Sequence, residues 1–198
     1  LLGYKAGQFT LNSDSETGEA NAGNIISIGA NSANLNSRNW RINIGNTAGG
    51  KNALRGGMAI GHFAGADDQG IQAMAIGFEA GQTDQGTRGL AIGHQAGMNK
   101  QINEAIAIGA YSGVSGQGSS AVAIGRSAGQ TNQLSGSVAI GGSAGKVTQG
   151  AGSVAVGPAA GATNQGENCI AIGNLAGYLN QSSNSIVLNA TSLPQNAS

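Results

Sequence analysis

Charged and aromatic residues are scarce in this chain of 198 residues, of which 9% are charged and 4% aromatic. An average globular chain carries roughly 25% charged residues, so the composition is unlike that of a typical enzyme. The 9 Lys and Arg residues balance the 9 Asp and Glu residues, and a chain without net charge has no field that draws it to nucleic acid or to an anionic membrane. We therefore expect no nucleic-acid partner and no direct membrane insertion.

Cysteine, proline and long apolar runs are also nearly missing. The lone Cys169 cannot form a disulfide within the chain and so does not reveal the redox compartment. The 2 prolines exclude a collagen helix, and apolar runs such as residues 105–108 are far too short to span a bilayer. The chain begins at Leu1 without a signal segment, and we expect it to be a portion of a longer protein with its targeting or anchoring segment elsewhere.

Glycine, in contrast, is abundant, with 36 residues where the usual content is roughly 7%. Such an excess is typical of flexible low-complexity chains or of fibrous repeats, which differ in whether the glycines recur at a fixed period. Here a motif glycine recurs every 16 residues over nine steps without an insertion, and Asn189 takes its place in an eleventh copy. The motif glycines are Gly29, Gly45, Gly61, Gly77, Gly93, Gly109, Gly125, Gly141, Gly157 and Gly173.

A second glycine follows four residues after the motif glycine in nine copies. These residues are Gly49, Gly65, Gly81, Gly97, Gly113, Gly129, Gly145, Gly161 and Gly177. Together with the motif glycines and the N-terminal counterparts Gly3 and Gly7, they account for 21 of the 36 glycines. Most of the glycine excess therefore marks turns of a regular coil rather than a flexible chain.

A period-two pattern precedes each motif glycine. Large aliphatic residues or Met stand one and three residues before it, with alanine between them in seven consecutive copies from Ala59 to Ala155. The pattern predicts a short β-strand with both large side chains on one face. We expect these two columns to form the core and the alanine side to be a flat outer face. The columns are Ile26, Ile42, Met58, Met74, Leu90, Ile106, Val122, Val138, Val154, Ile170 and Ile186, and Ile28, Ile44, Ile60, Ile76, Ile92, Ile108, Ile124, Ile140, Val156, Ile172 and Leu188.

Glutamine stands eight residues after the motif glycine in eight consecutive copies. A merely polar turn position would also hold Asn, Ser and Asp, so the uniform column predicts an amide ladder in which each side chain bonds the next unit. The residues are Gln69, Gln85, Gln101, Gln117, Gln133, Gln149, Gln165 and Gln181.

A 16-residue unit cannot bury a core alone, so the units must stack. The repeat predicts an all-β parallel β-solenoid in which coils lie about 4.8 Å apart, so that ten coils make a rod roughly 50 Å long. We expect an N-terminal repeat remnant with a protruding loop over 1–24, a β-roll of eleven repeats over 25–189 and an exit segment over 190–198. Since so narrow a roll buries little apolar area and its flat faces can pack on an identical copy, we also expect a parallel homotrimer.

Repeat units such as Ser-Val-Ala-Ile-Gly at 137–141 and Ser-Val-Ala-Val-Gly at 153–157 resemble the head repeats of the YadA-type trimeric autotransporter adhesins. The resemblance covers 25–189 and implies a left-handed parallel β-roll, three chains side by side, and binding to extracellular matrix proteins or other cells. The repeats of that family are commonly shorter. The longer form, which closes at 184–191, is also similar to repeats in fibre-like proteins of large algal viruses and phage tails, and both resemblances imply an extracellular location on a cell or virion surface.

We expect no catalytic residue and no cofactor. Residues 125–129 and 141–145 match the G-x-S-x-G pattern of a nucleophile elbow, but that elbow needs a following helix with a histidine and an acid within reach. Here the pattern follows from two repeat glycines four residues apart.

We expect no metal site either. The only histidines, His62 and His94, share one repeat position two coils apart, about 10 Å, which is too far for one metal ion. Copies of one histidine could meet on the axis of a trimer, but Phe78, Arg126 and Pro158 at the same position favour a solvent-facing turn.

Recognition residues are expected where the repeat breaks down, near its N-terminal end. The only tryptophan lies there, and an exposed tryptophan between arginines is typical of a binding hot spot or a sugar-stacking platform. The alternative is that this tryptophan caps the end of the roll or packs under the preceding loop. The candidate patch comprises Arg38, Trp40, Arg41, Lys51 and Arg55.

These features predict a non-enzymatic adhesin or fibre module that attaches multivalently to a host cell-surface or matrix protein or glycan. A purely structural fibre shaft or spacer is the close alternative. Ice binding by a flat solenoid face is a third, although regular Thr-x-Thr rows are missing from the sequence.

Overall fold

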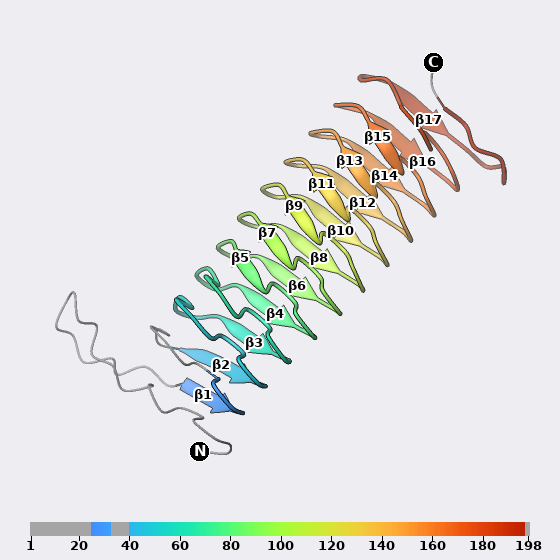
Figure 1. Cartoon of the computed structure of the whole chain (residues 1–198). Coiled ribbons are helices and arrows are strands. Elements are labelled where there is room, and N and C mark those ends of the chain that lie inside the picture. The colour runs from blue at the N-terminus through green and yellow to red at the C-terminus, as the bar shows by residue number, and fades with distance from the viewer. Residues whose placement is uncertain (1–24, 33–39, 197–198) are drawn as a thin grey trace.

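The computed structural model describes residues 25–32 and 40–196, which form a rod of stacked coils (Figure 1). All regular elements in these two stretches are β-strands. No helix that could cross a membrane occurs in them. The described part of the chain is an all-β parallel β-solenoid, which confirms the predicted fold class.

One sheet of eleven strands runs along the rod, in the order β1-β2-β3-β4-β6-β8-β10-β12-β14-β16-β17. Each strand pairs in parallel with its equivalent 16 residues further on, for example Ala123 with Ala139. The predicted strand before each motif glycine and the predicted register are therefore both correct. The strands are β1 (Ile25–Ile28), β2 (Arg41–Ile44), β3 (Met58–Ile60), β4 (Met74–Ile76), β6 (Leu90–Ile92), β8 (Ile106–Ile108), β10 (Val122–Ile124), β12 (Val138–Ile140), β14 (Val154–Val156), β16 (Ile170–Ile172) and β17 (Ile186–Leu188).

A second parallel sheet of six short strands has the order β15-β13-β11-β9-β7-β5. Its strands are paired through their first and third residues, as in Thr83 with Asn99 and Gln85 with Gln101. The residue between them, such as Asp84 with a φ of 53°, is left-handed, so this side of the coil bends around its interior. The strands are β5 (Thr83–Gln85), β7 (Asn99–Gln101), β9 (Ser115–Gln117), β11 (Thr131–Gln133), β13 (Val147–Gln149) and β15 (Thr163–Gln165).

Alanine lines the interior of the coils, which reverses the expected position of the core. The alanine at the centre of each long-sheet strand, such as Ala91, is fully buried and packs with a second alanine column that includes Ala96. The Ile, Val, Leu and Met columns that were expected inside lie half-buried or exposed on the outer face. The strand pattern was right and the choice of its inner face was wrong, because the narrow coil leaves room only for methyl groups beside the glutamines.

The expected glutamine ladder is present, and all eight of its side chains are buried. In Gln101, Nε2 donates to the carbonyls of Leu90 at 2.9 Å and Ala105 at 3.0 Å, and to Oε1 of Gln117 in the next coil at 3.2 Å. Each glutamine thus ties its own coil closed and bonds the following coil. This arrangement satisfies polar groups that would otherwise be costly to bury.

The motif glycine is required by close approach between successive coils. Gly93 has a φ of 128°, and a Cβ placed on it would lie 2.8 Å from the backbone carbonyl of Gly109. No side chain fits at this corner, which explains why the residue is fixed through ten copies.

The far end of the rod is closed by the chain itself. Beyond β17 the backbone N–H of Gln195 donates to the carbonyl of Leu175 at 3.2 Å, and Asn196 Oδ1 accepts from the N–H of Leu179 at 2.8 Å. The described residues of the expected exit segment therefore fold back onto the last complete coil.

Candidate functional site

The candidate recognition patch from the sequence is divided by the structure. Trp40 is 64% exposed with a φ of 61°, and Lys51 and Arg55 are also exposed. Lys51 Nζ lies 3.8 Å from a carboxylate oxygen of Asp67 in the next coil. Arg38 and the expected loop over 1–24 lie outside the described residues. The exposure of Trp40, Lys51 and Arg55 leaves their role in recognition a prediction.

Arg41 does not belong to an exposed patch, because its side chain is only 1% exposed. It extends into the coil where Ala53 stands in place of the ladder glutamine. Its guanidinium donates to the carbonyl of Leu54, to Oδ1 of Asn43 at 3.3 Å and to Oε1 of Gln69. Arg41 therefore supplies the first rung of the ladder, Gln69, with the donor that a preceding glutamine would have provided.

The guanidinium of Arg41 carries a buried charge. No ion pair to it occurs within 25–32 and 40–196, and its Nε, Asn43 Nδ2 and Ser27 Oγ have no hydrogen-bond partner there. Removal from water disfavours the charged form and lowers the pKa of Arg41 to about 10. The first coils are therefore less well satisfied than the glutamine ladder that follows.

The largest functional surface is the outer side of the long sheet, which we call the outer apolar face. It consists of the two columns that flank the buried alanines from β1 to β17, and none of its residues is charged or polar. Ile140 and Ile172 are among its more exposed members. The face is continuous because every strand repeats the same two positions in register.

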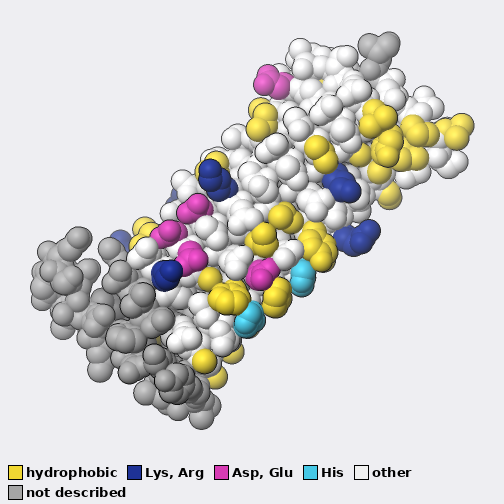
Figure 2. All heavy atoms as spheres, viewed as in Figure 1, with side chains coloured by type: hydrophobic (Ala, Val, Ile, Leu, Met, Phe, Trp, Pro, Cys, Tyr) yellow, Lys and Arg dark blue, Asp and Glu magenta, His cyan; other side chains and the backbone are white. Residues whose placement is uncertain are grey.

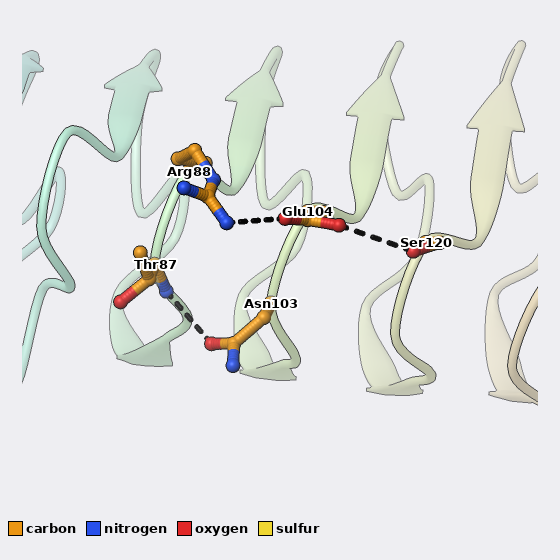
Figure 3. Close-up of polar contacts among 5 residues, drawn as sticks. All are labelled: Thr87, Arg88, Asn103, Glu104 and Ser120. Atoms are coloured by element: carbon orange, nitrogen blue, oxygen red, sulfur yellow. Dashed lines mark hydrogen bonds and ion pairs between the residues drawn. The ribbon is translucent and has the colours of Figure 1, made fainter.

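The side of the rod seen in Figure 2 is different in character, since it consists mainly of uncharged polar surface with scattered charges. Polar side chains there bond from coil to coil. Arg88 pairs with Glu104, to which Ser120 donates at 3.5 Å, and Asn103 Oδ1 accepts from the N–H of Thr87 at 2.9 Å (Figure 3). These rungs consume hydrogen-bonding groups within the protein and serve the stacking of the coils.

Five rings gather at the turn after the motif glycine in four successive coils, and we call them the aromatic corner: His62, Phe63, Phe78, His94 and Tyr111. Phe78 is stacked between the two histidines, with ring centroids 5.3 and 5.2 Å apart. Phe63 packs edgewise on His62 at 4.2 Å, and Tyr111 on His94 at 5.0 Å. Both histidines are exposed, as expected for a solvent-facing turn, and Figure 2 shows histidines and hydrophobic side chains side by side along one edge of the rod.

Sequence analysis placed the two histidines correctly but missed the row. Phe78 was read only as a sign of variability at their position. Its spacing of 16 residues from each histidine was the signal that the three rings stack.

The described residues offer no arrangement of catalytic or metal-binding groups. Within 25–32 and 40–196, no group of three His, Cys, Asp or Glu side chains could hold a metal ion. The two serines of the G-x-S-x-G segments, Ser127 and Ser143, stand at positive φ in turns that lead into β11 and β13 rather than into a helix. The geometry that can act on other molecules is therefore that of surfaces.

Comparison with known proteins gives no significant match to any family model, curated protein or solved structure.

Proposed function

We propose that this chain is a non-enzymatic module of a surface adhesin or fibre, in which parallel rods associate through the outer apolar face. The face itself is the observation that carries the proposal. Eleven strands about 4.8 Å apart make it about 50 Å long, and with a width of about 12 Å it covers roughly 600 Å². This area is at the upper end of what monomers expose and approaches the ≈ 800 Å² that each partner contributes to a standard interface.

A second copy of the chain is the partner that fits this face best. Its columns rise by the same distance per coil, so two parallel rods keep their side chains in register along the whole length. Three rods around an axis would cover the face with a closed, symmetric contact. The expected homotrimer is therefore retained as a proposal, with the isoleucine columns rather than the alanine side at the interface.

The proposed attachment to a host cell surface or matrix follows from repetition. A stiff rod presents similar turns at each coil, and three rods multiply every weak contact. This mode of binding needs no deep pocket and suits an extracellular location. A spacer without a ligand would share the rod and the assembly but not the attachment.

The oligomeric state tests the assembly. We expect light scattering at micromolar concentration to give about three times the chain mass of 19.3 kDa. Ile140→Asp should shift the mass to that of one chain, because Ile140 lies on the outer apolar face and is 38% exposed. Val147→Asp is the matched control, since Val147 is 36% exposed on β13 of the second sheet, and it should leave the mass unchanged.

A wild-type mass of one chain would refute the proposed assembly. Attachment is tested separately by biolayer interferometry on fixed cells and on collagen-coated sensors. Trimeric rods that bind neither surface would favour the spacer. Ice binding gains no support from the second sheet, whose first strand position mixes Thr83 and Thr131 with Asn99, Ser115 and Val147.

A further inference from the structure

We propose that the aromatic corner binds an extended, neutral polysaccharide chain that lies along the rod. This inference rests on the proposed adhesive function and names its ligand class. It concerns a surface separate from the outer apolar face, so the two proposals can fail independently.

The rings are not required by the solenoid. The turn position of His62, Phe78 and His94 is occupied by Ala110 and Gly142 in other coils, which have the same backbone turn. Of the five Phe, Tyr and Trp residues in the described part of the chain, three lie at this corner together with both histidines. A concentration of rings that the fold does not need, on an exposed turn, is typical of a recognition surface.

The geometry of the row suits a linear ligand. From His62 to Tyr111 the row crosses three coil steps of about 4.8 Å, or about 14 Å. A β-linked chain of hexopyranose units advances by a similar distance per sugar, so successive sugars meet successive coils. An extended peptide has a shorter repeat and would lose this register.

The terminal rings provide faces for stacking. Tyr111 meets His94 at an interplanar angle of 65° and Phe63 meets His62 at 81°, so at least one face of each terminal ring takes no part in the row. Tyr111 is exposed, and Phe78 presents the rim of its ring at 43% exposure. The electron-rich face of an aromatic ring attracts the C–H groups on one side of a pyranose.

Polar groups beside the rings match sugar hydroxyls. Gln95 Nε2 donates to Glu79 Oε2 at 2.6 Å, and this bond holds the two side chains next to the stack. The amide oxygen of Gln95 and the second carboxylate oxygen of Glu79 take no part in it and can accept hydrogen bonds from hydroxyls. The ring nitrogens of His62 and His94 add further donor and acceptor positions on the same edge.

The charge of the corner favours a neutral polymer. Across its four coils, the two turn positions after the motif glycine hold one carboxylate, Glu79, and no Lys or Arg. A nucleic acid or a sulfated glycan would find no cation to pair with there.

Affinity electrophoresis in native gels tests the inference. The gels contain hydroxyethyl cellulose, glucomannan or glycol chitin as linear polymers, and heparin as the anionic comparison. We expect at least one of the three linear polymers to retard the wild-type protein while heparin does not. Phe78→Ala and Phe78→Leu should both weaken retardation by at least about tenfold, because Leu retains apolar bulk but not the ring.

Leu134→Ala is the matched control, since Leu134 is also 43% exposed but lies at another corner of the coil; it should leave retardation unchanged. Wild-type mobility unaffected by all three linear polymers would overturn the inference, as would equal retardation of Phe78→Leu and the wild type. If cells are still bound while no polymer is, the adhesive function stands and the polysaccharide ligand fails. Oligomeric mass and thermal unfolding of each variant show that the rod itself is intact.

Discussion

Replacement of one ladder glutamine by methionine should destabilise the rod by an amount that depends on the next rung. In Gln117→Met the shape of the side chain is nearly retained, but four hydrogen bonds are lost. Nε2 of Gln117 donates to the carbonyls of Ile106 at 2.7 Å and Ala121 at 3.3 Å and to Gln133 Oε1 at 3.2 Å, while its Oε1 accepts from Gln101 at 3.2 Å. The substitution leaves Gln133 Oε1 buried without a donor.

The chain contains its own control at Gln149. This residue bonds the carbonyls of Val138 at 2.9 Å and Ser153 at 3.3 Å and accepts from Gln133 at 3.1 Å. It does not bond the following rung, because Gln165 Oε1 has no hydrogen-bond partner in the described part of the chain. Gln149→Met therefore removes the same kinds of contact without orphaning a further acceptor.

The difference between the two variants isolates one buried, unsatisfied amide oxygen, which costs about 1–3 kcal/mol. We expect Gln117→Met to lower the free energy of unfolding by that much more than Gln149→Met, as measured by urea denaturation with equal m-values. Hydrogen exchange would assign the loss to the coils on either side of residue 117. Equal free energies for the two variants, or greater stability of Gln117→Met, would refute the ladder as a source of stability.

Two further predictions concern the turn glycine and the buried arginine. Gly93→Ala should cost more than about 3 kcal/mol, since its Cβ would meet the backbone of Gly109, whereas Gly136→Ala, with nothing within 4 Å of the new Cβ, should cost about 1 kcal/mol; comparable losses of thermal stability would contradict the close-approach account. Burial lowers the pKa of Arg41 to about 10, so above pH 10 the folded chain releases this proton before the unfolded chain does. The unfolding free energy of the wild type relative to Arg41→Met should then rise by up to about 1.4 kcal/mol per pH unit, and a difference that stays constant from pH 9 to pH 11 would show that the guanidinium is not buried as a cation.

The regular part of the fold was predictable because its period is written in the sequence. Motif glycines such as Gly93 gave the corner, and the uniform glutamines gave both the register and the bond that joins the coils. A single residue type at one position through eight copies is informative, since few side chains can repeat a bond at that spacing.

The inside and outside of the coil were not predictable from alternation alone. A period-two pattern has two faces, and hydrophobicity assigns the larger side chains to the interior by default. The tolerance of the outer columns was the missed signal: Met58, Leu90 and Val122 occupy one column although their shapes differ, whereas a close-packed interior holds a constant volume. Alanine at the strand centre met that condition.

The recognition surfaces were predicted less well because they depend on contacts between neighbouring coils. Arg41 was grouped with Trp40 by proximity in the sequence, but alternation along β2 turns its side chain inward. The aromatic corner could be found only by comparing residues 16 apart, as in Phe78 and His94, rather than by searching for local motifs.

The way the coils are joined also determines how the rod bears load. Hydrogen bonds between coils run along the rod axis, so a force that pulls its two ends apart acts on one coil boundary at a time. Each coil released adds 16 residues of chain, which extend to about 54 Å in place of about 4.8 Å of rod. A rod under tension would therefore lengthen in equal steps of about 50 Å, from either end, and dissipate the work of pulling without losing the stacking of the remaining coils.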